Sequence, residues 1–232
     1  MRKISGSIAV RFILKVLGER TFTVIPAGCM SAVGFIYPQL CFSNNAIIST
    51  FPGTASMLSG VAAGAKALGL KDYHVVGIAG DGGTADIGIQ ALSGAIDRRD
   101  KIIYICYDNE AYMNTGIQKS GLTPYGAKTT TTPVGDHIRG TITQKKNMFE
   151  IVAAHGIDYA ATASVGYVQD FINKIQKASK VDGTSYIHVF APCPTGWGTP
   201  TDSAIDIAKE VVDSGLWYLA EYENGEFVLN RN

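Results

Sequence analysis

Two polar motifs in this 232-residue chain contain residue types suited to holding a phosphate group and a metal ion. The first is Gly80-Asp81-Gly82-Gly83, and the second begins at Asp108-Asn109. Glycines let the backbone approach an anion closely, and the free amides of a helix expected to begin near Thr84 favour negative charge. Neither motif contains lysine or arginine, so a divalent cation bound by Asp81 and Asn109 would have to neutralise the anion. The motifs therefore predict a site for magnesium and a diphosphate.

A Gly-Asp-Gly turn on its own has a simpler interpretation, with glycine for a tight turn and aspartate as a helix cap. The spacing favours the ligand site. Asp81 and Asn109 are 28 residues apart (109 − 81), about the length that one helix and one strand occupy. The two motifs should therefore reach adjacent strand ends, where ligands bind in open parallel sheets.

Apolar strand patterns alternate with amphipathic helix patterns along the chain, which predicts an α/β fold with a mostly parallel sheet and helices on both faces. We expect one domain over residues 1–232, with a functional loop at 116–140 and a C-terminal hairpin tail at about 216–232 that turns at Asn224-Gly225. The expected strands are 22–25, 73–79, 101–107, 158–162 and 185–190, and the expected helices are 6–17, 55–68, 84–98, 148–155, 167–180 and 203–214.

Charge and cysteine content exclude several classes of function. Twenty basic residues balance twenty acidic ones, so neither nucleic acid nor an anionic membrane surface is expected as a partner. The four cysteines are widely spaced without a C-x-x-C pair, which argues against a secreted disulfide framework or a zinc site and favours a cytoplasmic protein. The basic start at Met1 is followed by an apolar stretch that Ser5, Gly6 and Arg11 interrupt, so no targeting segment is expected.

Residues 21–65 form a stretch of 45 residues (65 − 21 + 1) without a charged side chain. Pro26, Pro38 and Pro52 argue against a membrane-spanning helix. Burial in the core and burial in a subunit interface would each explain the missing charge. The loop-like sequence at 43–45 and 52–54 favours the interface.

Several motifs in this order resemble the thiamine-diphosphate-binding β subunit of the 2-oxoacid:ferredoxin oxidoreductases, most closely that of pyruvate:ferredoxin oxidoreductase. They are GDGGTADIG from Gly80, YDNEAYMNTGIQKS from Tyr107, LTPYGAKTTTTPVG from Leu122 and APCPTGW from Ala191. A generic thiamine-diphosphate enzyme would share the Gly-Asp-Gly and an asparagine, but not these segments in this order. The resemblance covers nearly the whole chain.

This resemblance implies a set of cofactor-binding residues, namely Gly80, Asp81, Gly82, Gly83, Asn109, Ala111, Asn114 and Thr115. It implies that Mg²⁺ is bound by the side chains of Asp81 and Asn109 and by the backbone carbonyl of Ala111. Asn114 matches a family residue close to the thiazolium ring and the 2-oxoacid, which makes it the candidate catalytic residue; the alternative is a turn residue. Gln118 and the run 129–132 either line the same cavity or satisfy the loop backbone.

The resemblance also implies the reaction and its partners. The expected reaction is oxidative decarboxylation of a 2-oxoacid such as pyruvate to acyl-CoA and CO₂, or the reverse synthesis, with coenzyme A as cosubstrate and electrons passing to iron–sulfur clusters and ferredoxin. In this family a glutamate of the α subunit activates the cofactor, and no glutamate of this chain is well placed for that role. We therefore expect an α subunit, together with γ and ferredoxin-like δ subunits, and no activity from the isolated chain.

The chain departs from the family pattern at the positions that hold a [4Fe–4S] cluster. The family pattern has a C-x-x-C pair near the N-terminus, then one cysteine in Pro-Ala-Gly-Cys and one in Pro-Cys-Pro. Cys29 and Cys193 match the last two positions, whereas Arg2 and Ser5 occupy the first two. Cys29 and Cys193 are therefore either residual iron–sulfur ligands or buried thiols. Two further hypotheses follow, a non-oxidative decarboxylase subunit and a non-catalytic scaffold that binds the cofactor.

The remaining polar and aromatic candidates have structural interpretations. We expect Lys145 and Lys146 to be ordinary solvated charges and His188 to be a histidine satisfied by its surroundings. Trp197 and Trp217 are expected to pack against neighbouring residues, with Trp197 close enough to the Cys193 motif to cover it, and Cys41 and Cys106 are expected to lie in the core.

Overall fold

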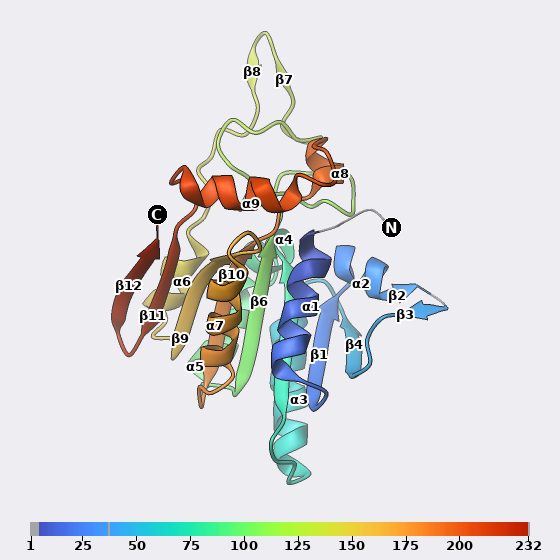
Figure 1. Ribbon diagram of the computed structural model, residues 1–232, viewed down its shortest axis with the longest axis vertical. Coiled ribbons are helices and arrows are strands. Elements are labelled where there is room, and N and C mark those ends of the chain that lie inside the picture. The colour runs from blue at the N-terminus through green and yellow to red at the C-terminus, as the bar shows by residue number, and fades with distance from the viewer. Residues whose placement is uncertain (1–4, 37, 232) are drawn as a thin grey trace.

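A central sheet organises the computed structural model, which describes residues 5–36 and 38–231 (Figure 1). Within these residues the sheet has eight strands in the order β12-β11-β9-β10-β6-β5-β1-β4. All neighbouring strands from β9 to β4 run parallel, and β11 and β12 add an antiparallel edge. This is the predicted α/β class, a mostly parallel sheet with a small C-terminal hairpin.

The strands of the main sheet are β1 (Thr21–Pro26), β4 (Asn45–Ser49), β5 (His74–Gly80), β6 (Ile102–Asp108), β9 (Tyr159–Ser164), β10 (Thr184–Phe190), β11 (Leu219–Glu223) and β12 (Glu226–Arg231). Two short hairpins lie outside it, formed by β2 (Phe35–Ile36) with β3 (Gln39–Leu40) and by β7 (Val134–Gly135) with β8 (Ile138–Arg139). The helices are α1 (Ser5–Leu17), α2 (Cys29–Gly34), α3 (Thr54–Ala67), α4 (Asp81–Ala85), α5 (Ile89–Asp97), α6 (Met148–Ala154), α7 (Val168–Ala178), α8 (Pro194–Trp197) and α9 (Ala204–Asp213).

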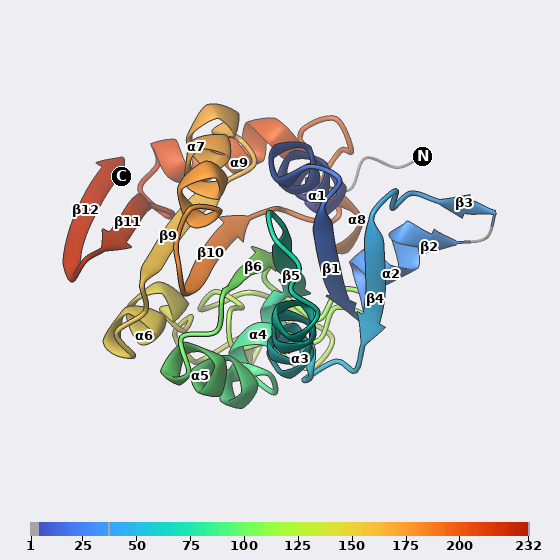
Figure 2. The same ribbon diagram turned by 90° about the horizontal axis from the view of Figure 1, so that it is seen from below.

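Alternating side chains of the central strands build one apolar core on each face of the sheet. Along β6, Ile103 and Ile105 pack in the core with α1, α7 and α9, whereas Ile102 and Tyr104 pack in the core with α3, α5 and α6. Figure 2 shows these two groups of helices on opposite faces. Because β6 is buried along its whole length, it reads as a continuous apolar run, as central parallel strands do.

The predicted helix 84–98 is wrong in one respect, because the chain forms two helices there. α4 begins at Asp81, three residues before the expected start, and the chain leaves the helix before α5 begins at Ile89. A Cβ atom on Gly88 would lie 2.0 Å from the carbonyl oxygen of Gly83, so the two helices approach too closely there for a side chain. The other predicted helices and strands are confirmed to within two residues at each end.

The uncharged segment 21–65 contains elements that the sequence did not predict, including α2 and β4. β1 lies inside the sheet, and its residues Val24 and Ile25 are fully buried. β4 forms the sheet edge, where Ile47 and Ile48 are 39% and 48% exposed. Core burial therefore explains only part of the missing charge, and the subunit interface stays a prediction for the β4 edge.

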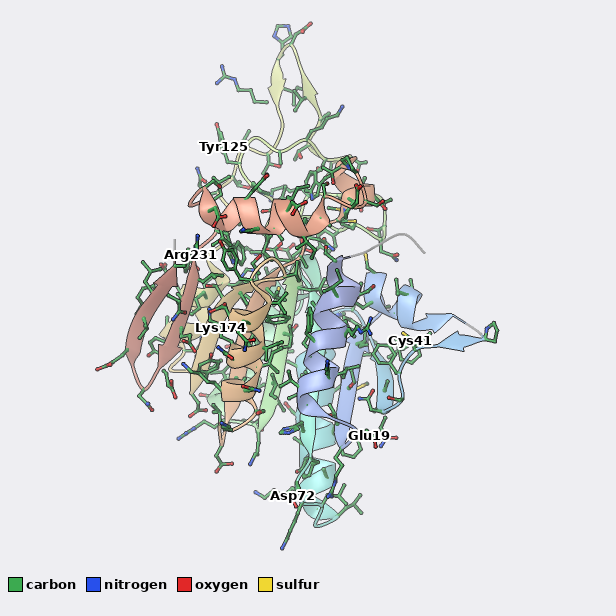
Figure 3. The ribbon with its side chains drawn as sticks, viewed as in Figure 1. Glu19, Cys41, Asp72, Tyr125, Lys174 and Arg231 are labelled. Atoms are coloured by element: carbon green, nitrogen blue, oxygen red, sulfur yellow. The ribbon has the colours of Figure 1, made fainter. Side chains whose placement is uncertain are left out.

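The C-terminal tail forms the predicted hairpin. Asn224 and Gly225 have φ angles of 54° and 83°, as a type I′ turn requires. Cys41 contradicts its prediction, because it is exposed beside the β2–β3 hairpin (Figure 3), whereas Cys106 is buried in the core as expected. Within residues 5–36 and 38–231, no helix combines the length and the apolar character that crossing a bilayer requires.

Candidate functional site

The two polar motifs lie at adjacent strand ends. β5 and β6 pair in parallel with Gly80 opposite Tyr107, so Asp81 and Asn109 leave the sheet at the same edge. Both are buried, with 2% and 6% of their surface exposed. The prediction that the motifs of Asp81 and Asn109 lie at adjacent strand ends is therefore confirmed.

Three oxygen atoms converge at this edge. The side-chain oxygen of Asn109 lies 2.9 Å from the carbonyl oxygen of Ala111 and 3.2 Å from Oδ1 of Asp81. All three atoms are acceptors, so their close approach is relieved either by turning the amide, so that its NH₂ donates to both oxygens, or by a cation between them. A carboxylate, an amide oxygen and a carbonyl oxygen are hard ligands of the kind that Mg²⁺ prefers. The donor set therefore fits the predicted metal.

This oxygen set differs from a cluster of acidic or histidine ligands. Among the described residues, no three His, Cys, Asp or Glu side chains are grouped so that they could hold a metal. Burial and the negative charge of Asp108 together raise the pKa of Asp81 well above its ordinary value. A cation at Oδ1 would supply the compensating charge that this buried carboxylate lacks.

The other oxygen of Asp81 is held by Ser120, which the sequence analysis did not single out. The Ser120 hydroxyl donates to Oδ2 of Asp81 and accepts a hydrogen bond of 3.1 Å from the amide of Leu122. Ser120 is 1% exposed and belongs to the predicted functional loop, 39 residues from Asp81. It fixes the carboxylate so that Oδ1 remains directed at Asn109.

The backbone of the Asn109 turn is held by side chains from distant segments. The indole N–H of Trp197 donates to the carbonyl of Asn109 over 3.0 Å, and the Thr123 hydroxyl donates to the carbonyl of Glu110 over 2.6 Å. The amide of Glu110 donates to Oδ1 of Asp108 over 2.9 Å. Trp197 was expected to pack or to cover the cysteine motif, and its hydrogen bond to the carbonyl of Asn109 is an additional role.

Asp108 lies at the centre of a buried ionic network. Its Oδ2 is 2.7 Å from Nζ of Lys145 and 2.9 Å from Nε2 of His188. Lys145 Nζ is also 2.8 Å from Glu110 Oε1 and lies 4.9 Å from the ring centre of Trp217. The prediction that Lys145 is a solvated charge is wrong, because two acidic partners 35 and 37 residues away in sequence (145 − 110, 145 − 108) hold it inside the fold.

The charges in this network follow from its burial. Burial alone would raise the pKa of Asp108, but Lys145 and His188 outweigh that effect and hold it below its ordinary value. Burial lowers the pKa of Lys145, but Asp108 and Glu110 outweigh it and raise that pKa overall. Burial lowers the pKa of His188 despite its bond to Asp108, so this histidine is neutral at pH 7.

One cavity of about 800 Å³ contains all eight predicted cofactor-binding residues in its lining. They are Gly80, Asp81, Gly82, Gly83, Asn109, Ala111, Asn114 and Thr115. Cys29, Phe51, Ile48 and Ile87 also line this space, which we call the Asp81 cavity. Its volume lies within the range of small-molecule and cofactor sites.

Positions 82 and 83 of the first motif are occupied by glycine for different physical reasons. A Cβ atom on Gly82 would lie 2.3 Å from the ring of Tyr112, so this glycine is required by packing whether or not a ligand binds. A Cβ atom on Gly83 would make only an ordinary contact of 3.4 Å with Phe51. Close approach to an anion therefore remains the better explanation for Gly83 than for Gly82.

Side chains of the threonine run and of Gln118 form hydrogen bonds within the loop. The Thr130 hydroxyl donates to the carbonyl of Gly116 over 2.9 Å, and the amide of Gln118 donates to the carbonyl of Thr115 over 3.0 Å. Neither the run 129–132 nor Gln118 is among the residues that line the Asp81 cavity. The first interpretation, as cavity-lining groups, is therefore not supported for the described part of the chain.

The cysteine positions do not provide four thiolates. Cys29 lines the Asp81 cavity, and Cys193 is buried with its sulfur accepting from the amide of Gly196 at 3.4 Å. Ser5 is fully buried, and its hydroxyl donates to the carbonyl of Pro192, beside Cys193. Arg2 lies outside the described residues. Since a standard [4Fe–4S] cluster needs four thiolates, Cys29, Cys193 and Ser5 do not fit it.

The Cys29 thiol is protonated in this environment. Burial, followed by the nearby Cys193 and Asp81, raises the pKa of Cys29 to about 11. A thiol with such a pKa is a poor nucleophile at pH 7.

Comparison with known proteins identifies a family for most of the chain. Residues 26–189 match the family described as "Thiamine pyrophosphate enzyme, C-terminal TPP binding domain". The chain is 51% identical to the ketoisovalerate oxidoreductase subunit VorB of Pyrococcus horikoshii, over 97% of this chain and 74% of that protein. It is 50% identical to the pyruvate synthase subunit PorB of Methanothermobacter thermautotrophicus, over 96% of this chain and 77% of that protein.

A solved structure has the same fold at low sequence identity. The 2-oxoglutarate:ferredoxin oxidoreductase from Magnetococcus marinus, a structure with 2-oxoglutarate, coenzyme A and succinyl-CoA bound, aligns with a TM-score of 0.75 and 18% identity. The alignment covers 91% of this chain and 68% of that one. At this identity the match supports the fold class alone.

Asp86 provides a test of how the functional loop is attached to α4. Its carboxylate accepts hydrogen bonds from Tyr112 (2.8 Å), Lys146 (2.9 Å) and the amide of Gly121 (3.0 Å). Burial would raise its pKa, but Lys146 and Gly121 outweigh burial, so the pKa lies below its ordinary value of 3.8. Such a group stabilises the fold above its unfolded-state pKa, and this stabilisation is lost as the pH falls through the folded-state pKa.

We expect Asp86→Asn to lower the free energy of unfolding at pH 7 by about 1–3 kcal/mol. The difference from the wild type should shrink as the pH falls below about 4 and through the lower folded-state pKa, as measured by denaturant unfolding at pH 7 and at about pH 2. Asp72→Asn is the matched control, because Asp72 is an exposed aspartate far from this loop (Figure 3). An equal difference at pH 7 and at about pH 2 would show that the ionised carboxylate is not what holds the loop.

Proposed function

Since this chain belongs to the thiamine-diphosphate-binding β subunits of the 2-oxoacid:ferredoxin oxidoreductases, we propose that its Asp81 cavity binds thiamine diphosphate with Mg²⁺. We propose that the complete complex decarboxylates a small 2-oxoacid such as pyruvate to acyl-CoA and CO₂, or runs the reverse synthesis, with electrons delivered to ferredoxin. Relatives of similar identity are named for pyruvate and for ketoisovalerate, which supports a small apolar 2-oxoacid as the substrate class.

The observation that carries this proposal is that the Asp81 carboxylate, the Asn109 side-chain amide and the Ala111 carbonyl meet at one buried edge of the sheet. In the proposed site these three groups would hold Mg²⁺, and the backbone of Gly83 would hold the diphosphate. Asp81 contributes the negative charge, while Asn109 and Ala111 contribute neutral dipoles. When bound, thiamine diphosphate supplies a carbon nucleophile and an electron sink for the decarboxylation.

Asn114 is the residue proposed to contact the substrate. It is exposed and lines the Asp81 cavity, five residues beyond the proposed ligand Asn109 (114 − 109). Its amide can donate to a carboxylate or developing oxyanion of the 2-oxoacid. Thr115 also lines the cavity, although its hydroxyl already donates to Gln118, which directs it toward the loop.

The proposal requires a partner subunit to complete the site. Of the described residues that line the Asp81 cavity, Asp81 is the one acid, and it is assigned to the metal. Glu110, the neighbouring acid, is paired with Lys145. An activating glutamate from an α subunit would therefore have to enter from outside. Ile48 and Ile87 line the cavity and are 48% and 52% exposed, which provides an apolar surface for such a partner.

The proposed role of Asp81 as a metal ligand can be tested by substitution. We expect Asp81→Asn in the purified complex to weaken Mg²⁺-dependent retention of thiamine diphosphate at least about tenfold, because the site loses its only charged ligand. Equilibrium dialysis over a Mg²⁺ series measures this directly, and Asp72→Asn serves as the control. Unchanged retention in Asp81→Asn would contradict the assignment of the metal site.

The activity test uses the complex and the isolated chain side by side. We expect the complex to reduce a viologen dye when both a 2-oxoacid and coenzyme A are added, with pyruvate and ketoisovalerate tested separately. We expect the isolated chain to show no decarboxylation. Aldehyde production without dye reduction would instead favour the non-oxidative decarboxylase, and cofactor binding without either product would favour the scaffold.

The cysteine positions favour a subunit that lacks the family's cluster. The Ser5 hydroxyl is already bonded to Pro192, and only Cys29 and Cys193 supply sulfur there. We expect the double variant Arg2→Cys and Ser5→Cys to increase the iron content of the anaerobically purified complex by about four atoms per copy of this chain. Iron and acid-labile sulfide analysis measures the gain. An equal iron content in wild type and variant would contradict the prediction.

A further inference from the structure

We propose that Lys145 is a positioning residue that holds the metal loop, residues 108–111, in its ligand-binding shape and thereby sets the affinity of the site for Mg²⁺. This inference rests on the proposed function. Neither the motif resemblance nor the comparisons assign Lys145 a role.

Lys145 pairs with the two acids that flank the proposed amide ligand. Lys145 Nζ lies 2.7 Å from the carboxylate of Asp108 and 2.8 Å from that of Glu110. These two acids directly precede and follow Asn109 in the sequence. A single ammonium group therefore ties together the residues on either side of the proposed amide ligand.

The metal loop has an uncommon backbone conformation. Glu110 has a φ angle of 70°, a left-handed conformation that is uncommon for a residue with a side chain. This turn brings the carbonyl of Ala111 back to within 2.9 Å of the Asn109 side chain. Without Lys145 the two acids Asp108 and Glu110 would repel each other across the turn. The ammonium therefore favours the conformation that makes the oxygens converge.

Lys145 is itself held in place by aromatic rings and by its own backbone. Its ammonium lies 4.9 Å from the ring centre of Trp217 and 5.9 Å from that of Phe190, which shield it from water and strengthen its ion pairs. The amide of the next residue, Lys146, donates to the carbonyl of Gly121 over 2.9 Å, and Asn147 caps α6. The loop and α6 thus fix the backbone from which Lys145 reaches the metal loop.

The sign of the effect separates positioning from simple electrostatics. Lys145 is a cation near the proposed cation site, so on charge alone its removal should tighten Mg²⁺ binding. Positioning predicts the reverse, because a relaxed turn would separate Asn109 and Ala111 from Asp81. A purely structural role predicts lower stability with Mg²⁺ affinity unchanged.

The experiment measures Mg²⁺ affinity at saturating thiamine diphosphate in the purified complex. We expect Lys145→Met to weaken Mg²⁺ binding about 10–100-fold, the range found for residues that orient metal ligands. Lys145→Arg, which keeps a charge that can reach both acids, should restore most of the affinity. Glu110→Gln, at a partly exposed residue, breaks one of the two ion pairs and should give a smaller loss. This variant tests the proposal even if Lys145→Met fails to fold.

Lys174→Met is the control for removing an ion-paired lysine from another part of the fold. Lys174 is 1% exposed on α7 and bonds to Asp170 and to the carbonyl of Thr162, both over 2.8 Å (Figure 3). We expect this variant to lower the unfolding temperature without changing Mg²⁺ affinity.

Asp81→Asn in the same assay separates the two proposals. If Asp81→Asn weakens Mg²⁺ binding but Lys145→Met leaves it within twofold of the wild type, or tightens it, the positioning role is wrong and the metal site stands. If Asp81→Asn has no effect, the proposed function itself fails.

Discussion

The parallel pairing of β5 with β6 is the constraint on which the site depends. With Gly80 opposite Tyr107, the chain leaves both strands at one level, and the side chains of Asp81 and Asn109 must meet. A shift of one residue in this register would turn every side chain of the strand to the opposite face and disrupt both cores. Packing of the sheet therefore determines the separation of the proposed ligands before any metal is bound.

Burial at this edge creates a demand for positive charge that the chain meets only in part. Lys145 compensates Asp108 and Glu110, and the neutral His188 adds a hydrogen bond without charge. The Ser120 hydroxyl donates to Asp81 and Lys145 acts on its charge, but burial and Asp108 outweigh both and raise the pKa of Asp81. A cation bound at this carboxylate would supply the charge that its burial otherwise disfavours.

The sequence was sufficient for the parts of this arrangement that depend on local pattern. Apolar runs ending in Gly-Asp and Asp-Asn indicated two neighbouring buried strands with polar ends, and all eight residues taken from the motif resemblance line one cavity. Lys145, Ser120 and Trp197 were missed because each acts on residues 35 to 88 positions away. In sequence, Lys145-Lys146 has the same pattern as a solvated pair of lysines, and only the folded chain shows that Lys145 is mostly covered and paired with two acids. The edge strand β4 was missed because it is half exposed and lacks a regular alternation of apolar residues.

The Asp81 cavity is lined both by the proposed metal ligands and by half-exposed apolar residues. This difference suggests how the proposed enzyme would assemble. The proposed ligands, their loop anchors and the ionic network all belong to this chain. Ile48 and Ile87 also line the cavity and are half exposed, and among the described lining residues Asp81 is the one acid. A cofactor held by Asp81 would still need a partner that covers this apolar surface. Proton transfer would then depend on the partner that covers it, so binding could precede assembly while catalysis could not.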